Sequence, residues 1–295
     1  MVALALDIGG TKMAAGIVDA DGTVPHPATT PTPATGVADA CGALLREVAG
    51  TAKITSVGIA CAGPVDTVAG TASPINIDEW AGRFGLVGLV HELFPGVPAR
   101  LAMDGAAAAL GEHHHGAGRG VPDLLSLVVS TGIGGGVVLG GRIATGRTGN
   151  AGHIGHLVVP GGTEPCTCGG VGCLETVASG PSSVRWARSQ GWRGTTGVAL
   201  ARSAADGDDV AVAALDRAGT ALGQAIASAA ALLDVDLAVI GGGFAQAGPA
   251  LWDPMRTAAA RHARLSFVAG LRVVPAELGA SGTLVGAGVL AVGEG

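Results

Sequence analysis

The sequence predicts an α/β protein of two related lobes with a cleft between them. Apolar runs of strand length alternate along its 295 residues with segments whose apolar residues recur at helical spacing. A strand, a glycine loop, a second strand and a glycine turn occur at the start of the chain and again roughly a hundred residues later. This weak internal repeat indicates duplication, and a cleft between duplicated lobes is a common place for a ligand.

The first half of the chain opens with strands that flank a glycine loop. Val2–Ile8 and Met13–Asp19 are apolar runs and predict the two strands of a hairpin. Val37–Ala49 has apolar residues at helical spacing and predicts a helix. The other elements predicted in this half are the strands Ser56–Ala60 and Ala99–Met103 and an alanine-rich helix that opens at Asp104 and runs to His113.

The second half begins in the same way, with the apolar run Leu124–Val129, the glycine loop Ser130–Gly136 and the run Val137–Leu139. The elements predicted after it are the helices Asp216–Leu233, Trp252–Ala263 and Thr283–Val292 and the strands Leu237–Ile240 and Leu271–Val274. We expect a small lobe of residues 1–108, completed by a C-terminal helix at 283–295, and a large lobe of residues 109–282.

Composition and charge narrow the class of partner. With 48% apolar and 3% aromatic residues, aliphatic side chains must fill the cores. The net charge is −6 and there is no basic block, so we expect neither nucleic acid nor a lipid surface as a partner. No signal peptide and no apolar stretch of membrane-spanning length is evident, and we expect a cytoplasmic protein.

Three glycine loops each follow a predicted strand, where backbone N–H groups converge on anions. The loop Asp7–Lys12 adds a hydroxyl and a lysine for phosphate, and Asp7 could hold magnesium directly or through water. A single glycine loop is often only a tight turn, but three after strands favour ATP with Mg²⁺. The predicted ATP-binding residues are Asp7, Gly9, Gly10, Thr11, Lys12, Ser130, Thr131, Gly132, Gly134, Gly241, Gly242 and Gly243. Polyphosphate remains an alternative donor.

Three cysteines form the pattern C-x-C-x4-C at Cys166, Cys168 and Cys173, a short distance after Gly-His-Ile-Gly-His. Three thiolates and one imidazole make a closed tetrahedral zinc site of the structural kind. His156 is the preferred fourth ligand and His153 its competitor. The alternative, three thiols packed as small apolar groups, fits poorly among glycine and threonine.

These motifs together resemble the ROK family of repressors, open reading frames and sugar kinases. The matching segments are Asp7–Lys12, Gly63–Asp66, Asn76–Trp80, Asp104 with Gly111 and Glu112, Ser130–Gly136, Gly149–Gly180 and Gly241–Gly243. The resemblance covers essentially the whole chain. It implies a duplicated actin-like (ribonuclease H-like) ATPase fold, with ATP between the lobes and transfer of its γ-phosphoryl group to a hexose, usually at O6.

The resemblance also assigns roles to single residues. It makes Asp104 the catalytic base, a role that suits a positioned carboxylate, since a hydroxyl must lose its proton as it attacks phosphorus. His156 would bind zinc with one ring nitrogen and sugar with the other. The sugar-binding residues that it implies are Gly63, Asn76, Met103, Asp104, His153, His156 and Glu175.

Two residues depart from the family pattern in the sugar pocket. Met103 stands where the family usually has Asn, and His153 stands where glucose kinases commonly have Glu. Bacterial N-acetylmannosamine kinases, which the stretch Ser130–Gly180 resembles, also have histidine at the position of His153. This histidine favours a sugar modified at C2. Met103 favours a change near C3, as in the 3-amino sugar kanosamine. A glucokinase that tolerates both replacements is the alternative.

A non-catalytic sugar sensor is the rival hypothesis from another class. We expect no helix-turn-helix domain before the first glycine loop, and the chain keeps Asp7, Lys12 and Asp104, which a sensor does not need. We therefore expect an enzyme, acting as a homodimer or higher homo-oligomer.

Overall fold

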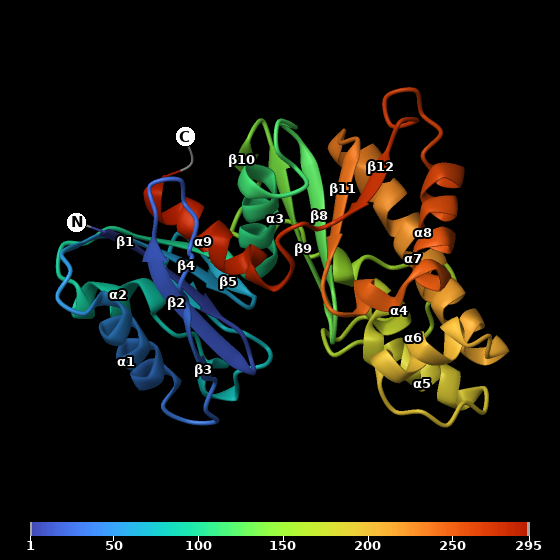
Figure 1. Cartoon of the computed structure of the whole chain (residues 1–295), viewed down its shortest axis with the longest axis horizontal. Helices are drawn as coiled ribbons and strands as arrows, with labels where there is room; N and C mark the ends of the chain where they lie inside the picture. Colours follow the sequence, from blue (N-terminus) through green and yellow to red (C-terminus); the bar gives the residue numbers. More distant parts are fainter. Residues whose placement is uncertain (1, 294–295) are drawn as a thin grey trace. The chain divides into compact units, whose positions relative to one another are not determined.

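The computed structural model describes residues 2–293 (Figure 1). The last two residues of the helix expected at 283–295 lie outside this range, as does Met1. The chain divides into two compact units. The first unit comprises Met1–Pro122, Gly136–Gly152 and Ala280–Gly295, and the second unit comprises Asp123–Gly135 and His153–Gly279.

The first unit contains a five-stranded sheet of order β3-β2-β1-β4-β7. β1 pairs antiparallel with β2 and parallel with β4, and β4 pairs parallel with β7. Its strands are β1 (Val2–Ile8), β2 (Lys12–Val18), β3 (Ala28–Pro31), β4 (Ile54–Cys61) and β7 (Ala99–Met103), and β5 (Val65–Asp66) and β6 (Thr71–Ala72) form a separate pair. The predicted opening hairpin is confirmed.

Helices cover both faces of this sheet, because alternate residues of a strand point to opposite sides. Leu4 and Leu6 of β1 share a core cluster with Leu45, whereas Ala3 shares another with Ala287. The helices of this unit are α1 (Val37–Ala49), α2 (Leu86–Leu93), α3 (Asp104–His115) and α9 (Gly282–Val292), with a short 3₁₀ turn, η1 (Asp78–Trp80). The sequence pattern had not indicated α2, which has only two turns.

The second sheet has the order β10-β9-β8-β11-β12. β11 runs parallel to β8 and to β12. The strands are β8 (Leu124–Val129), β9 (Ile133–Leu139), β10 (Arg142–Ile143), β11 (Leu237–Gly241) and β12 (Arg272–Pro275). In each sheet the first strand of that half of the chain lies in the middle, the next two strands follow on one side, and the last two follow on the other. This shared order confirms the predicted duplication.

The second unit is rich in helices. They are α4 (Leu174–Ala178), α5 (Gly180–Ser189), α6 (Gly197–Ala205), α7 (Asp209–Leu233) and α8 (Pro249–His262), with the 3₁₀ turns η2 (Ile154–His156), η3 (Phe244–Ala247) and η4 (Gly279–Ser281). α7 begins at Asp209, earlier than the expected Asp216, because the Asp208 side chain accepts a hydrogen bond from the Ala211 N–H and caps the helix there. Gly219 and Gly223 bring α7 close to α8, since a Cβ on either would meet the α8 backbone.

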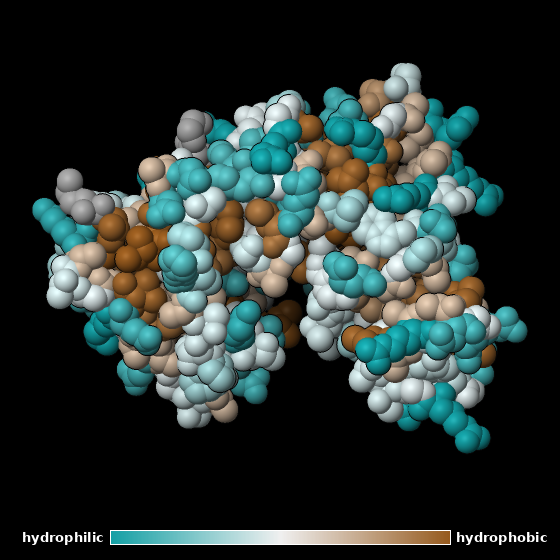
Figure 2. All heavy atoms as spheres, viewed as in Figure 1, coloured by the Kyte–Doolittle hydropathy of each residue, from teal (hydrophilic) through white to brown (hydrophobic). Residues whose placement is uncertain are grey.

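The surface of the chain is mixed in polarity. In the face seen in Figure 2, apolar residues reach the surface among hydrophilic ones, as is usual for folded domains. Among the described residues, no helix combines the length and the apolar composition that crossing a bilayer requires.

Candidate functional site

Asp104 stands where β7 ends and α3 begins, as the sequence predicted. Its Oδ1 accepts a hydrogen bond from the Gly105 N–H at 2.7 Å, at the positive end of the helix dipole. Burial nevertheless raises the pKa of this carboxyl, with the Gly105 hydrogen bond acting in the opposite direction. A carboxylate held in this way is a stronger proton acceptor than an ordinary aspartate.

Asp7, near the end of β1, is electrostatically coupled to Asp104. Burial, followed by the negative charge of Asp104, raises the pKa of Asp7 to about 7, while Lys12 lowers it. Burial, followed by the charges of Asp104, Cys41 and Asp7, raises the pKa of the Cys61 thiol well above its ordinary value. Two carboxylates coupled in this way in a largely buried place favour binding of a proton or a metal ion.

The first glycine loop is held by Thr32, the residue after β3, and lies against an asparagine. The Thr32 Oγ1 donates to the Gly9 carbonyl at 2.6 Å, and the Thr32 N–H donates to the Thr11 carbonyl at 3.1 Å. A Cβ on Gly10 would lie 2.6 Å from the Asn76 Cγ, so the loop passes directly against the Asn76 side chain. The fold thus brings together a predicted phosphate-binding glycine and a predicted sugar ligand.

The segment that carries Gly63 is anchored by a residue that the sequence did not single out, Asn150. Its Oδ1 accepts from the Val65 N–H at 2.9 Å, and its Nδ2 donates to the Val65 carbonyl at 2.6 Å. The Ile75 N–H donates to the Gly63 carbonyl at 3.4 Å and links this segment to the one carrying Asn76. In the sequence, an asparagine that follows Thr-Gly gives no indication that it binds a segment far away along the chain.

Met103 is only 2% exposed and belongs to the main core cluster of the first unit. Its thioether packs among aliphatic residues of the sheet and of α1 and α2. This environment suits an apolar residue, which gives Met103 a structural role whatever it contributes to a ligand.

Glu175 lies in the first turn of α4 and reaches the second glycine loop. Its Oε2 accepts a hydrogen bond from the Ile133 N–H at 2.7 Å, and a Cβ on Gly132 would lie 2.5 Å from the same oxygen. The His153 ring lies near Glu175 and 5.8 Å, centroid to centroid, from the His156 ring. Burial and then the charge of His156 lower the pKa of His153, while Glu175 raises it.

Among residues 2–293, one group of three or more His, Cys, Asp or Glu side chains could hold a metal ion. It consists of His156, Cys166, Cys168 and Cys173. Their ligand atoms lie within 4.8 Å of one another. The Cys168 and Cys173 sulfurs are 3.7 Å apart, and the Cys166 sulfur is 3.7 Å from the His156 Nδ1. Tetrahedral Zn–S bonds of about 2.3 Å place two sulfurs about 3.8 Å apart, so the group fits zinc. Of the two candidate histidines, His156 joins the cluster.

Charge within this cluster also indicates a cation. Burial, followed by interactions with the Cys166 and Cys168 thiols, raises the pKa of Cys173 to about 12. The Gly170 N–H, which donates to the Cys168 sulfur at 3.4 Å, lowers the pKa of that thiol. Three thiolates this close together would repel one another, so a bound cation would favour their ionised forms.

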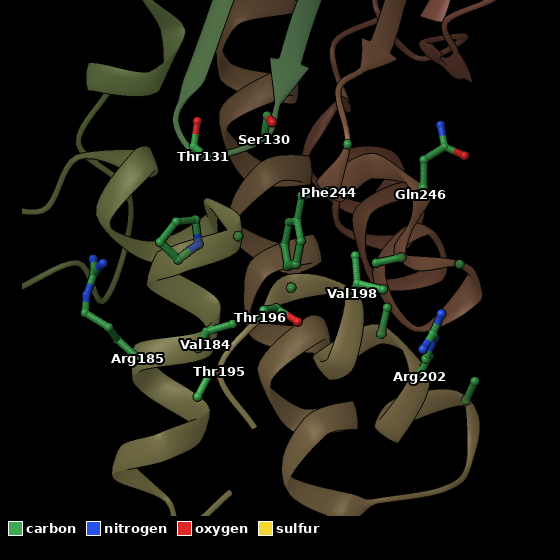
Figure 3. Close-up of a pocket in the computed structure, with 18 of the residues that line it drawn as sticks. Ser130, Thr131, Val184, Arg185, Thr195, Thr196, Val198, Arg202, Phe244 and Gln246 are labelled. Carbon is green, nitrogen blue, oxygen red and sulfur yellow. The ribbon is translucent and has the colours of Figure 1, made fainter. Parts of the chain in front are cut away.

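The second and third glycine loops meet at a cavity of about 880 Å³ in the second unit. Ser130 and Thr131 lie at one end, and the Phe244 ring faces the middle of the cavity in Figure 3. Gly243, from the third loop, also lines it. Further lining residues come from α5, from α6 and the two residues before it, from η3 and from the start of α8: Pro181, Val184, Arg185, Arg188, Thr195, Thr196, Val198, Arg202, Gln246 and Pro249.

None of the residues from α5 and α6 was predicted from the sequence. Two cap signals could have located these helices. Ser179 accepts a hydrogen bond from the Ser182 N–H and is followed by a proline in the first turn of α5, and Thr196 accepts one from the Ala199 N–H at the start of α6.

The division into units sorts the predicted site residues. Those in the first unit are Asp7, Gly9, Gly10, Thr11, Lys12, Gly63, Asn76, Met103 and Asp104. Those in the second unit are Ser130, Thr131, Gly132, Gly134, His153, His156, Cys166, Cys168, Cys173, Glu175, Gly241, Gly242 and Gly243.

Known proteins resemble the chain over nearly its whole length. A family model described as the ROK family matches residues 3–294. An N-acetylmannosamine kinase of Escherichia fergusonii is 32% identical over 244 residues, which are 82% of this chain and 83% of that protein. The ROK hexokinase from Thermus thermophilus superposes with a TM-score of 0.87 at 35% identity, over 99% of this chain and 98% of that one.

A ROK family glucokinase from Streptomyces griseus, solved in complex with glucose and AMPPNP, superposes with a TM-score of 0.83 at 32% identity over 99% of both chains. The predicted duplicated actin-like α/β fold is confirmed by these neighbours and by the matching strand orders of the two sheets. The chain belongs to the ROK family.

Proposed function

We propose that the chain is an ATP-dependent kinase that transfers the γ-phosphoryl group to the 6-hydroxyl of an amino or N-acylamino hexose. Sugar kinase activity is supported by membership of the family and by relatives named as kinases of N-acetylmannosamine and glucose. The observation that carries the proposal is Asp104, a partly buried carboxylate with a raised pKa at a strand-to-helix junction, coupled to Asp7 in the first glycine loop.

In the proposed reaction Asp104 accepts the proton of the 6-hydroxyl as its oxygen attacks the γ-phosphorus. A new O–P bond forms, the bond from the γ-phosphorus to the β,γ-bridging oxygen breaks, and ADP leaves. Asp7 would hold the magnesium ion of the nucleotide, directly or through water. A bound magnesium ion would favour the ionised form of Asp7, whose pKa is raised to about 7 without it.

The cavity in the second unit is the proposed site of the nucleoside. Its volume of about 880 Å³ lies within the range of roughly 300–1,000 Å³ usual for ligand pockets. Val184, Val198 and Phe244 supply apolar surface for the adenine ring. The glycine loops at Ser130 and Gly243 supply backbone groups for the phosphates and the ribose. ATP, which this cavity suits, is therefore the proposed donor.

The Cys₃His group is the proposed zinc site. His156, Cys166, Cys168 and Cys173 would fill all four positions of a tetrahedral ion, which leaves no place for a reacting water. Zinc would therefore hold the chain around Cys173 rigid, and with it Glu175 two residues later.

Replacing Asp104 with Asn tests the proposed base. We expect turnover to fall about a hundred- to ten-thousand-fold, because the amide cannot accept the proton, while sugar binding stays within a few-fold of the wild-type value. The measurement is ADP release with saturating ATP, alongside sugar binding by calorimetry. Turnover within about tenfold of wild type would remove Asp104 from the role of base.

A panel of sugars tests the acceptor class. N-acetylmannosamine, kanosamine, glucosamine and glucose should be compared by kcat/KM, and we expect an amino or N-acylamino hexose to be preferred, since His153 replaces the usual glutamate. His153→Glu should shift the preference toward glucose. It is a cleaner change than Met103→Asn, because Met103 is 2% exposed and an amide there would lose core packing. If the wild-type protein prefers glucose over every hexosamine, the proposed acceptor class is wrong and the glucokinase alternative holds.

A further inference from the structure

The second glycine loop is fastened at several points to the segment that follows the cysteine cluster. The Gly180 N–H donates to the Ser130 carbonyl at 2.9 Å, at the start of the loop. Three residues later, the Glu175 Oε2 accepts from the Ile133 N–H at 2.7 Å. Gly155, next to His156, packs so closely on the Ile133 carbonyl that a Cβ would collide with it. The loop is therefore shaped by residues that surround the metal group.

The Glu175 carboxylate is the central side chain of this arrangement. One oxygen receives the Ile133 N–H and fills the space beside Gly132, where a Cβ would lie only 2.5 Å away. The other oxygen has no hydrogen-bond partner among residues 2–293 and remains available to a ligand. An N–H held by a carboxylate makes a strong, charge-assisted hydrogen bond, which restricts the loop to one conformation.

We propose that Glu175 is a positioning residue for the nucleotide: it holds the loop Ser130–Gly136 in the conformation that binds phosphate, separately from any contact with sugar. This rests on the proposed function, in which that loop binds the phosphates of ATP. Glu175 belongs to the segment that the metal group orders, so the same segment serves both substrates.

Binding of Mg-AMPPNP in the absence of sugar, measured by calorimetry, separates this role from sugar recognition. Glu175→Ala should weaken binding about tenfold, because the loop loses a charge-assisted hydrogen bond. Glu175→Gln should restore most of the affinity, since its amide oxygen can accept the same N–H. Asp253→Ala, an exposed carboxylate on α8, is the control and should bind as wild type.

A double-mutant cycle with Gly132→Ala sharpens the test. In the wild-type background the new Cβ must displace the carboxylate from Ile133, so it should weaken AMPPNP binding about as much as Glu175→Ala. In the Glu175→Ala background there is room for the methyl group, and the second substitution should cost little more. Fully additive losses would show that Gly132 and Glu175 act independently and would overturn the proposal.

The outcomes separate the two levels of inference. Wild-type protein that does not bind Mg-AMPPNP would refute the proposed kinase function. Wild-type protein that binds it, together with folded Glu175→Ala protein of unchanged affinity, would refute only the role of Glu175. If Glu175→Ala does not fold, Glu175→Gln and Gly132→Ala decide by themselves: wild-type affinity in Gly132→Ala would overturn the proposal, and a loss there with retention in Glu175→Gln would support it.

Discussion

At the scale of single residues, Asp7 is proposed to serve the nucleotide's magnesium ion, but its ionised form lowers the stability of the folded chain. Burial that raises the pKa of Asp7 to about 7 makes its ionised form costly in the folded chain. The unfolded chain ionises this group near its ordinary value of 3.8. Between these two values the folded state binds the extra proton, so stability falls as pH rises through this window.

Replacing Asp7 with Asn should therefore stabilise the metal-free, nucleotide-free protein at neutral and alkaline pH. We expect a higher Tm than wild type at about pH 8 and a much smaller difference at about pH 4, where the folded state keeps Asp7 protonated and the unfolded chain is only partly ionised. Thermal unfolding across this range measures the effect, with Asp253→Asn as an exposed control. A Tm difference that shrinks as pH rises would contradict the assigned direction of the pKa shift.

At the scale of elements, glycine decides how closely the helices of the first unit approach. Gly286 of α9 lies against the Ala107 carbonyl of α3, and Gly111 of α3 lies against the Gly282 carbonyl of α9, so a Cβ at either position would collide with backbone. Because Asp104 is the first residue of α3, this crossing also determines where the proposed base stands.

Gly286→Ala should therefore destabilise the protein by about 1–3 kcal/mol, as overpacking does in other cores, and should lower turnover through displacement of α3. Gly88 on α2 is the matched control, since apart from its own turn of the helix no heavy atom of the described residues lies within 4 Å of a Cβ placed there. Gly88→Ala should stabilise by about 0.5–1 kcal/mol, because alanine loses less backbone entropy in a helix. Denaturant unfolding measures both, and equal effects would show that the crossing tolerates a methyl group.

The buried strands were predicted from the sequence, whereas the short helices were missed, and the reason is physical. The strands β1, β4, β8 and β11 are buried apolar runs, and burial leaves a clear pattern in the sequence. Short helices such as α4, with five residues, hold too few turns for a period to be visible.

At the scale of the whole molecule, the metal group should control the stability of the second unit. One zinc ion per chain is expected by metal analysis, and its removal by a chelator should lower the Tm, because the thiolates would then repel one another or take up protons. Cys168→Ala should lose the metal with little loss of packing, since Cys168 is exposed. Cys41→Ala, in the core of the first unit, should keep it. Folded, active protein with no bound metal would contradict the zinc assignment.

The sequence by itself predicted the fold class, the duplication and the group of residues proposed to bind a metal. Each of these depends on signals that are local in the chain: strand-length apolar runs, glycine loops after strands, and three cysteines within eight positions. It also located Asp104 at a strand-to-helix junction, where the structure has it.

Tertiary structure alone decided which of these segments meet. The hydrogen bond from Ile133 to Glu175 joins residues 42 positions apart, and the anchoring of Val65 by Asn150 joins residues 85 positions apart. The cavity draws its walls from α5, α6 and η3, and Met103 proves to be a core residue. Periodicity and turn chemistry act between neighbours in the chain, whereas these contacts depend on how helices and sheets pack, which no local pattern encodes.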